Sequence, residues 1–190
     1  MLSPEEVRIV FDCGANIGIT SDFFAAQYPN ARIFSIEPDP RNFALLKRNV
    51  SQGRRIVQIC RALVGSPREQ VYLTTHAPAW GNSIAKSKTS VRVQASTIDE
   101  ICQERGILTS ICLNSIFEGA KKEVLANGRF LKWVNCGLVE LHDNYDVEAL
   151  KRDVSAWGFR VLEPSKERGL AMISVWPNSK SCAKDGADLL

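Results

Sequence analysis

The feature that most constrains this fold is a glycine-containing turn between an apolar run and a helical pattern. Residues 7–11 are mostly apolar, the turn reads Asp12-Cys13-Gly14-Ala15-Asn16-Ile17-Gly18, and a helical pattern begins near Ile19. A strand that ends in such a turn and opens a helix leads into the nucleotide-type pocket of doubly wound α/β sheets. Glycines let the backbone approach a ligand closely, and the helix start offers free N–H groups. The turn therefore predicts an α/β protein with a ligand site here.

Asp12, at the end of the predicted strand, bears on the chemistry of that ligand. A carboxylate there would repel a diphosphate but suits a ligand that carries an ammonium or a sulfonium group. This favours S-adenosylmethionine over NAD or ATP. Another interpretation is that Asp12 binds backbone N–H groups at the start of the helix, and both interpretations can hold together. For Asn16, capping the helix and facing the ligand are equally supported.

The first third of the chain alternates between strand and helix patterns, which is typical of a parallel sheet. The predicted elements are a strand at residues 7–13, a helix at 19–28, a strand at 31–36, a helix between 39 and 53, and a strand within 55–63. Phe23 and Phe24 are expected to face inward from the first helix. Asp39 as cap and Pro40 in the first turn predict the start of the second helix, and Gly53 its end.

The rest of the chain departs from this alternation. Residues 70–75 and 90–95 are expected to form an antiparallel pair over the pocket, around a polar loop. In that loop Trp80, Asn82 and Ser83 form either an acceptor lid or an ordinary hairpin connection. The later predicted elements are a helix at 97–103 with a capping box of Thr97 and Glu100, a strand within 107–117, a helix at 118–127, a strand at 133–141, a helix at 146–158, and antiparallel strands at 159–162 and 170–176.

Composition limits the class of protein. The length of 190 residues suits one domain, predicted over residues 1–177 with a flexible tail at 178–190, and the short start suggests a trimmed domain. The net charge of +3 is dispersed, which argues against nucleic acid, and no apolar run reaches the roughly 20 residues of a membrane span. Six cysteines without a CxxC pair, and two histidines, predict no metal site and a reducing, cytoplasmic compartment. The oligomeric state is not indicated.

Glu37 is the second signal for a ligand site. It lies 19 positions after Gly18, at the end of the second predicted strand. An acidic side chain at this place accepts hydrogen bonds from the two hydroxyls of an adenosine ribose, a need that NAD and S-adenosylmethionine share. The alternative is a surface carboxylate, but the offset from the glycine turn favours the ribose.

Several segments together resemble the FkbM-type methyltransferases. They are Val10 to Gly18, Ile36 to Phe43, Thr97-Ile98-Asp99, Glu118-Gly119-Ala120 and Val139-Glu140-Leu141-His142. The resemblance covers about residues 7–159. It implies a Rossmann-like class I methyltransferase fold, with a mostly parallel seven-stranded sheet, helices on both faces and a small β-hairpin insertion. It also implies methyl transfer from S-adenosylmethionine to an oxygen of a small molecule or a sugar.

The resemblance also implies the residues that hold the cofactor. The methionine end would lie against the turn after the first strand, the ribose against Glu37, and the adenine beside Arg61-Ala62-Leu63. The cofactor-binding residues implied in this way are Asp12, Gly14, Ala15, Asn16, Gly18, Glu37, Pro38 and Ala62.

The fourth strand departs from the family pattern. The family has Asp-x-Glu-Gly-Ala-Glu where this chain has Ile116-Phe117-Glu118-Gly119-Ala120-Lys121. Without a gap Ile116 replaces the aspartate, and with a two-residue shift Asn114 does. The difference matters because the end of this strand adjoins the methyl group, where an acid can take the proton of the acceptor.

Three interpretations of this departure remain open. Glu118 supplies the carboxylate, or alignment alone lowers the barrier, by about 7–11 kcal/mol at best, or the chain is a degenerate binding module with little or no catalysis. Glu118 can instead be a first-turn carboxylate that stabilises its helix. His142 is a second possible general base, since the unperturbed pKa of a histidine is about 6.5, or a loop histidine bonded to the backbone or to Asp143. An NAD-dependent oxidoreductase is disfavoured by Asp12.

Overall fold

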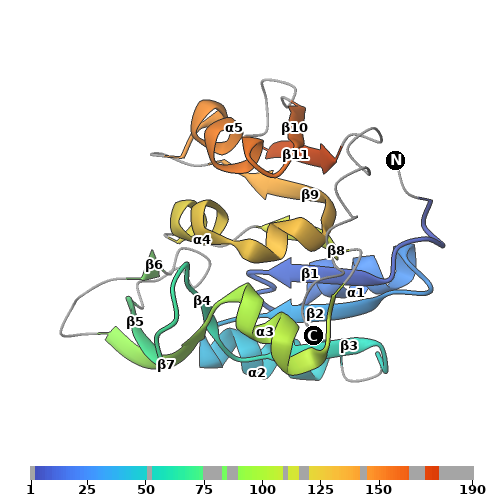
Figure 1. Ribbon diagram of the computed structural model, residues 1–190. Coiled ribbons are helices and arrows are strands. Elements are labelled where there is room, and N and C mark those ends of the chain that lie inside the picture. The colour runs from blue at the N-terminus through green and yellow to red at the C-terminus, as the bar shows by residue number, and fades with distance from the viewer. Residues whose placement is uncertain are drawn as a thin grey trace, which may run out of the picture.

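The computed structural model describes residues 3–50, 53–74, 83–84, 90–108, 111–115, 120–141, 145–162 and 170–175. A central sheet of seven strands runs in the order β10-β11-β9-β8-β1-β2-β3 and carries helices on both faces (Figure 1). Its strands are β1 (Ile9–Cys13), β2 (Arg32–Ile36), β3 (Ile56–Ile59), β8 (Ile111–Ser115), β9 (Val134–Glu140), β10 (Phe159–Leu162) and β11 (Leu170–Val175). The predicted seven-stranded α/β fold is confirmed.

The direction of the strands places the turn after β1 at the centre of one sheet edge. β1 lies parallel to β2 on one side and to β8 on the other, and β3 and β9 extend this parallel core. β11 is antiparallel to both β9 and β10, as predicted for the last two strands. Because the chain order reverses on either side of β1, the carboxyl end of β1 is the topological switch point where α/β proteins bind ligands.

Helices follow most of the parallel strands. They are α1 (Ile19–Gln27), α2 (Pro40–Asn49), α3 (Ile98–Arg105), α4 (Lys121–Asn127) and α5 (Val147–Ser155), with a 3₁₀ helix, η1, at Arg129–Trp133. Asp39 caps α2, since its Oδ1 accepts the Arg41 N–H at 2.8 Å. α2 ends at Asn49, before the predicted end at Gly53. The backbone of Gly53 instead closes a separate turn by donating to the Val50 carbonyl.

Alternation along the strands divides the core into two clusters. Phe11 and Phe34 point to one face, where their rings stack at 5.2 Å and meet the buried sides of α3, α4 and α5. Val10 and Ile33 point to the opposite face and pack with Leu46 of α2 and with parts of α1. Asp12 follows Val10 by two positions on β1, so it belongs to the face that α1 and α2 cover.

The inward orientation predicted for Phe23 is wrong, because 59% of its surface is exposed. Ser21 is buried in α1, and Phe24, Ala25 and Tyr28 pack partly buried against the core. These positions are spaced by three, four and seven residues from Ser21 and so form one helical stripe. Phe23 lies two residues from Ser21 and therefore points away from the sheet.

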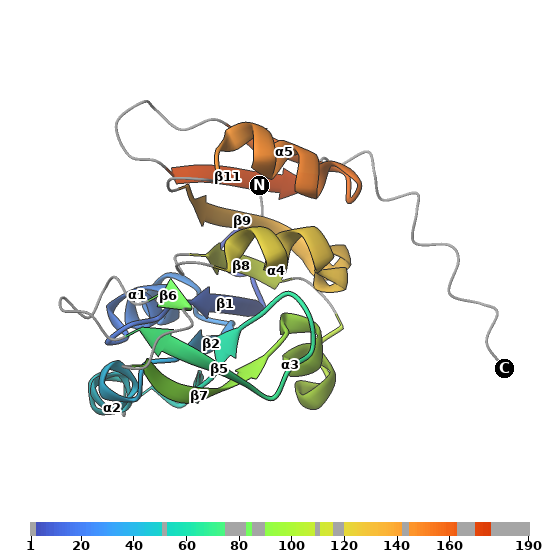
Figure 2. The ribbon, with the colours of Figure 1, turned by 90° about the vertical axis from the view of Figure 1, so that its left-hand side faces the viewer.

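The predicted hairpin is part of a larger second sheet. β5 (Gln70–Thr74) and β7 (Ser90–Ser96) pair antiparallel as predicted, and they run side by side in Figure 2. β6 (Ser83–Ile84) and β4 (Ala62–Leu63) extend them to four strands in the order β4-β7-β5-β6. The predicted third strand therefore divides, since its last residues leave the central sheet and pair with β7.

None of the helices in the described ranges has the length and apolar character that crossing a membrane requires. The division into a domain at residues 1–177 and a tail at 178–190 stays a prediction.

Candidate cofactor site

The turn after β1 is held in a left-handed backbone conformation and tied to the end of β2. Gly14 and Asn16 have φ angles of 85° and 50°. The N–H groups of Gly14 and Ala15 both donate to the carbonyl of Ile36 at 3.0 Å. A carbonyl can accept two such bonds because it has two lone pairs. These two bonds fix the backbone of the turn against the end of β2.

Gly18 is the N-cap residue of α1 and occupies a position where a side chain would not fit. Its φ angle is 92°, and a Cβ built on it would lie 2.9 Å from Cγ1 of Val50 and 3.3 Å from Cγ of Leu46. Two properties of this position therefore require glycine: its backbone conformation, and the close packing of the start of α1 on the end of α2. The sequence predicted a glycine turn, and the structure adds the steric reason for its last member.

Glu37 joins the turn after β1 to the segment that follows β2. Its Oε2 accepts the N–H of Asn16 at 2.9 Å, and its Oε1 accepts the N–H of Asp39 at 2.9 Å. Only 6% of Glu37 is exposed, so the alternative of a surface carboxylate is wrong. Burial raises the pKa of Glu37, and the hydrogen bonds from the backbone at Asp39 and Asn16 oppose that rise. The side chain of Asn42 also donates to this carboxylate. A carboxylate can accept about four hydrogen bonds in all, so Glu37 keeps the capacity to accept one more donor.

Asp12 is fully buried at the end of β1 and is held by side chains. Its Oδ2 accepts the hydroxyl of Ser21 at 2.6 Å, and its Oδ1 accepts Nδ2 of Asn114 at 2.9 Å. Ser35 in turn donates to Ser21 at 2.7 Å. The structure therefore holds Asp12 through a hydroxyl and an amide, where the alternative interpretation had backbone N–H groups. Burial raises the pKa of Asp12, and the bonds from Ser21 and Asn114 lower it.

Asn114 lies beside Asp12 because β1 and β8 are parallel and in register at these two residues. Its side chain is almost fully buried, and its Oδ1 has no hydrogen-bond partner among the described residues. A buried amide oxygen without a donor is costly, so this atom marks a place where a donor belongs. The sequence suggested Asn114 as a replacement for the missing acid but gave no sign of its contact with Asp12.

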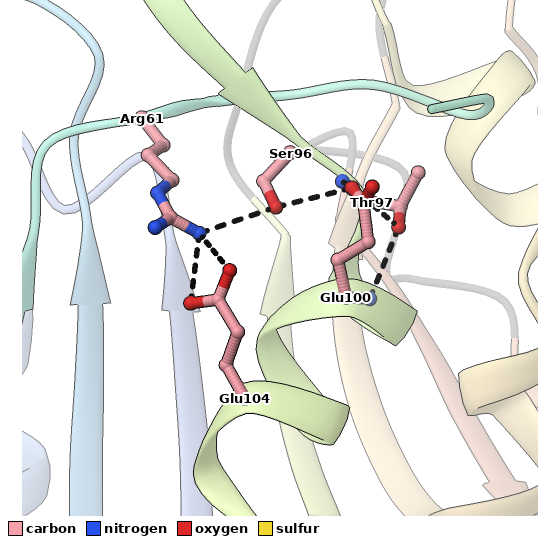
Figure 3. Close-up of polar contacts among 5 residues, drawn as sticks. All are labelled: Arg61, Ser96, Thr97, Glu100 and Glu104. Carbon is pink, nitrogen blue, oxygen red and sulfur yellow. Dashed lines mark hydrogen bonds and ion pairs between the residues drawn. The ribbon is translucent and has the colours of Figure 1, made fainter. Parts of the chain in front are cut away.

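The segment after β3 passes Glu37 and is fastened to α3. The N–H of Glu37 donates to the carbonyl of Ile59, the residue before Cys60, at 3.1 Å. Arg61 binds both carboxylate oxygens of Glu104, at 2.8 and 3.0 Å (Figure 3). Ala62 follows, almost fully buried at the start of β4. Its contact with an adenine stays a prediction.

The predicted capping box of α3 is confirmed. Ser96 connects it to Arg61. Oε2 of Glu100 accepts the backbone N–H of Thr97 at 2.7 Å, while Oγ1 of Thr97 accepts the N–H of Glu100 at 3.1 Å. Ser96 donates its hydroxyl to Glu100 at 3.2 Å, and Figure 3 shows it between Arg61 and Glu100. These bonds fix the start of α3 relative to the segment that carries Ala62.

The family model described as "Methyltransferase FkbM domain" matches residues 12–143, well over half of the chain. The chain belongs to this methyltransferase FkbM domain family. The resemblance inferred from the sequence motifs is thereby confirmed. No curated protein sequence matches the chain.

Solved structures share the fold of this FkbM domain. A methyltransferase FkbM from Methylobacillus flagellatus KT matches with a TM-score of 0.60 and 16% identity, over 92% of this chain and 44% of that one. A fibrillarin pre-rRNA processing protein of Methanococcus jannaschii matches at 0.54 and 14% identity, over 93% and 69%. Aeropyrum pernix fibrillarin, solved with natively bound S-adenosyl-L-methionine, matches at 0.50 and 17%, over 90% and 67%.

These likenesses show a Rossmann-like class I methyltransferase fold. This FkbM domain spans less than half the length of the Methylobacillus protein.

The two catalytic candidates, Glu118 and His142, lie outside the described residues, as do Ile116, Trp80 and Asn82. For Ser83 the structure describes the backbone alone, in β6. Among the described residues, no group of three or more His, Cys, Asp or Glu side chains is arranged to hold a metal ion. The described residues thus include every candidate for cofactor binding and neither of the two catalytic candidates.

Proposed function

We propose that this FkbM domain binds S-adenosylmethionine at the turn after β1 and transfers its methyl group to a hydroxyl oxygen of a small molecule or a sugar. The observation that carries the proposal is the placement of Glu37, a buried carboxylate that links the glycine turn to the start of α2. The membership of the chain in a methyltransferase family supports the choice of ligand.

The residues present suit this cofactor. Glu37, beside Pro38, would accept the ribose hydroxyls, the turn from Gly14 to Gly18 would hold the methionine end, and Ala62 would border the adenine. Oδ1 of Asn114, which no donor among the described residues reaches, is an acceptor next to the acid of β1. A cofactor that brings an ammonium group supplies the kind of donor this oxygen lacks, whereas a diphosphate supplies only acceptors.

The role of the chain in the reaction is alignment and proton transfer. When bound, the cofactor supplies an activated methyl group and leaves as a neutral thioether. Asp12 is unsuited as the base for the acceptor hydroxyl, because it is fully buried between Ser21 and Asn114. Asn114 is a neutral amide. Under this proposal Glu118 or His142 takes the proton.

A small acceptor and a cytoplasmic location belong to the same proposal. The net charge of +3 is dispersed along the sequence, which supports a small acceptor over nucleic acid. The described cysteines are free, which supports a reducing compartment.

A second candidate is a cofactor-binding module with little or no catalysis. It is favoured by one feature of the sequence: the acid of the family pattern is missing near the end of β8, where either Ile116 or Asn114 replaces it. The two candidates share the cofactor and differ only in turnover. An ordinary rate of methyl transfer to any hydroxyl acceptor would therefore exclude the second.

The test is a thermal unfolding measurement of the whole chain with S-adenosylhomocysteine and, separately, with NAD. A ligand present at 100 times its Kd stabilises the folded state by about 2.7 kcal/mol, which shifts the midpoint by several degrees. We expect this shift with S-adenosylhomocysteine and none with NAD. A shift with NAD alone, or with neither ligand, would overturn the proposed cofactor.

A further inference from the structure

Two thiols lie side by side on neighbouring strands of the central sheet. Cys112 of β8 and Cys136 of β9 are joined by a hydrogen bond between their sulfur atoms, which are 3.3 Å apart. Both are free and only half-buried. The fully buried Cys13 and Cys102 differ in this respect.

An irregularity in the sheet brings the two cysteines together. At the start of the pairing Ile111 lies opposite Val134, and the next residue, Cys112, lies opposite Cys136. Asn135 is the extra residue of a β-bulge. Without the bulge Cys112 would face Asn135, and Cys136 would be displaced by one position along the strand. Bulges re-aim side chains and are uncommon between parallel strands, so this one specifies the thiol pair.

We propose that Cys112 and Cys136 form a redox-active dithiol that a hydroperoxide, such as hydrogen peroxide, converts into a disulfide between β8 and β9. The geometry needs little change. Neighbouring strands are about 4.8 Å apart, within the Cα separation of about 4.4–6.8 Å that a disulfide spans. The sulfurs must approach by about 1.3 Å from their present 3.3 Å to reach a bond of about 2.05 Å.

The two thiols take different parts in the reaction. The hydrogen bond with Cys112 lowers the pKa of Cys136, while the same pairing and burial raise the pKa of Cys112. The thiolate of Cys136 attacks a peroxide oxygen, the O–O bond breaks, and hydroxide leaves as Cys136 becomes a sulfenic acid. The sulfur of Cys112 then attacks that sulfur, and the S–O bond breaks as the S–S bond forms. Two thiols and one hydrogen peroxide thus give one disulfide and two water molecules.

Trypsin can separate the two cysteines, because each lies in a peptide without another cysteine. Cleavage after Arg105 and Lys121 gives residues 106–121 with Cys112, and cleavage after Lys132 and Lys151 gives residues 133–151 with Cys136. The reduced full chain is treated with hydrogen peroxide, quenched in acid, alkylated and digested. We expect a linked pair of these two peptides, lighter than their sum by two hydrogen atoms, and a loss of two alkylated thiols.

Variants assign the roles. In C112S the disulfide cannot form, and Cys136 is expected to stop at a sulfenic acid that dimedone traps. C60S is the matched control, since Cys60 is also half-buried but its pKa is raised by burial, Glu37 and Asp39; it should leave the linked peptides unchanged. Absence of a Cys112–Cys136 link in the oxidised wild type, or a disulfide made instead with Cys60 or Cys182, would overturn the proposal. The wild-type map needs no variant to fold.

Discussion

Nδ2 of Asn114 donates to Oδ1 of Asp12 at 2.9 Å, across the β8–β1 pair at the switch point of the sheet. The two side chains are direct neighbours in the register, and both are buried. A neutral amide can donate to a carboxylate, whereas a second carboxylate at this place would face the first without water between them. The amide at residue 114 is therefore matched to the acid at residue 12.

This contact changes what an acid at position 114 would do. In N114D two buried carboxyl groups would share one proton, so the folded-state pKa of the pair would be raised well above the ordinary value for Asp. When the pKa of a group is higher in the folded than in the unfolded protein, the protein keeps its stability below the pKa of the unfolded state, which is near 3.9 for Asp. It then loses stability as the pH rises through the pKa of the folded state. We expect N114D to lose about 3 kcal/mol at pH 7 and far less at pH 4, measured by urea unfolding.

N114A is the control for N114D, because it removes the same hydrogen bond without adding a titratable group. It leaves Asp12 short of one donor and should cost about 1–3 kcal/mol, with a weaker dependence on pH. An N114D protein that is equally destabilised at pH 4 and pH 7 would contradict the direct contact of residues 12 and 114.

Gly18 and Gly106 provide a matched pair for the glycine turn. Both have a positive φ, 92° and 63°, but a Cβ at Gly18 would press on Val50 while one at Gly106 meets nothing within 4 Å. Alanine at Gly106 should cost about 1 kcal/mol, the ordinary cost of the left-handed conformation. G18A should cost at least about 2 kcal/mol, because strain and crowding add. Urea midpoints compare them, and equal costs would argue against close packing at Gly18.

Glu37 should be essential for the affinity of the proposed cofactor. Removing its carboxylate in E37A removes the ribose acceptor and the anchor of the Asn16 and Asp39 N–H groups. We expect S-adenosylhomocysteine to bind at least about tenfold more weakly, or about 1.4 kcal/mol, by calorimetry. E148A is the control, since Glu148 is an exposed carboxylate on α5 paired with Lys151. Unchanged affinity in a folded E37A would place the cofactor elsewhere.

The fold was predictable where local chemistry acts alone. Asp39 and Pro40 start α2, and Thr97 with Glu100 starts α3, because a cap needs only residues within one turn. The parallel sheet followed from the alternation of apolar runs. The inward orientation predicted for Phe23 was wrong. Which face of a nine-residue helix turns inward depends on which residues the sheet buries, and in α1 Ser21 is one of them.

The site was predictable only in part, for a related reason. The positions of Gly14, Gly18 and Glu37 follow from spacing along the chain, which a single sequence displays. The contact of Asp12 with Asn114 joins residues 102 positions apart, and it depends on the register of two strands. The bulge beside Cys112 is of the same kind. No local pattern encodes such pairings, so they require the structure.

The last prediction concerns the start of α3 and its dependence on pH. Hydrogen bonds from Thr97, first from its backbone N–H, lower the pKa of Glu100 below its ordinary value of 4.5. A lowered folded pKa means that the contribution to stability is complete above the unfolded pKa and is lost as the pH falls through the folded one. E100A should therefore cost about 1 kcal/mol at pH 7 and clearly less below pH 4. E104A, which removes only the half-exposed pair with Arg61, should cost less than E100A at pH 7. Urea unfolding of the three proteins at both pH values measures this, and a cost of E100A that persists in acid would show that the carboxylate charge is not what stabilises the capping box.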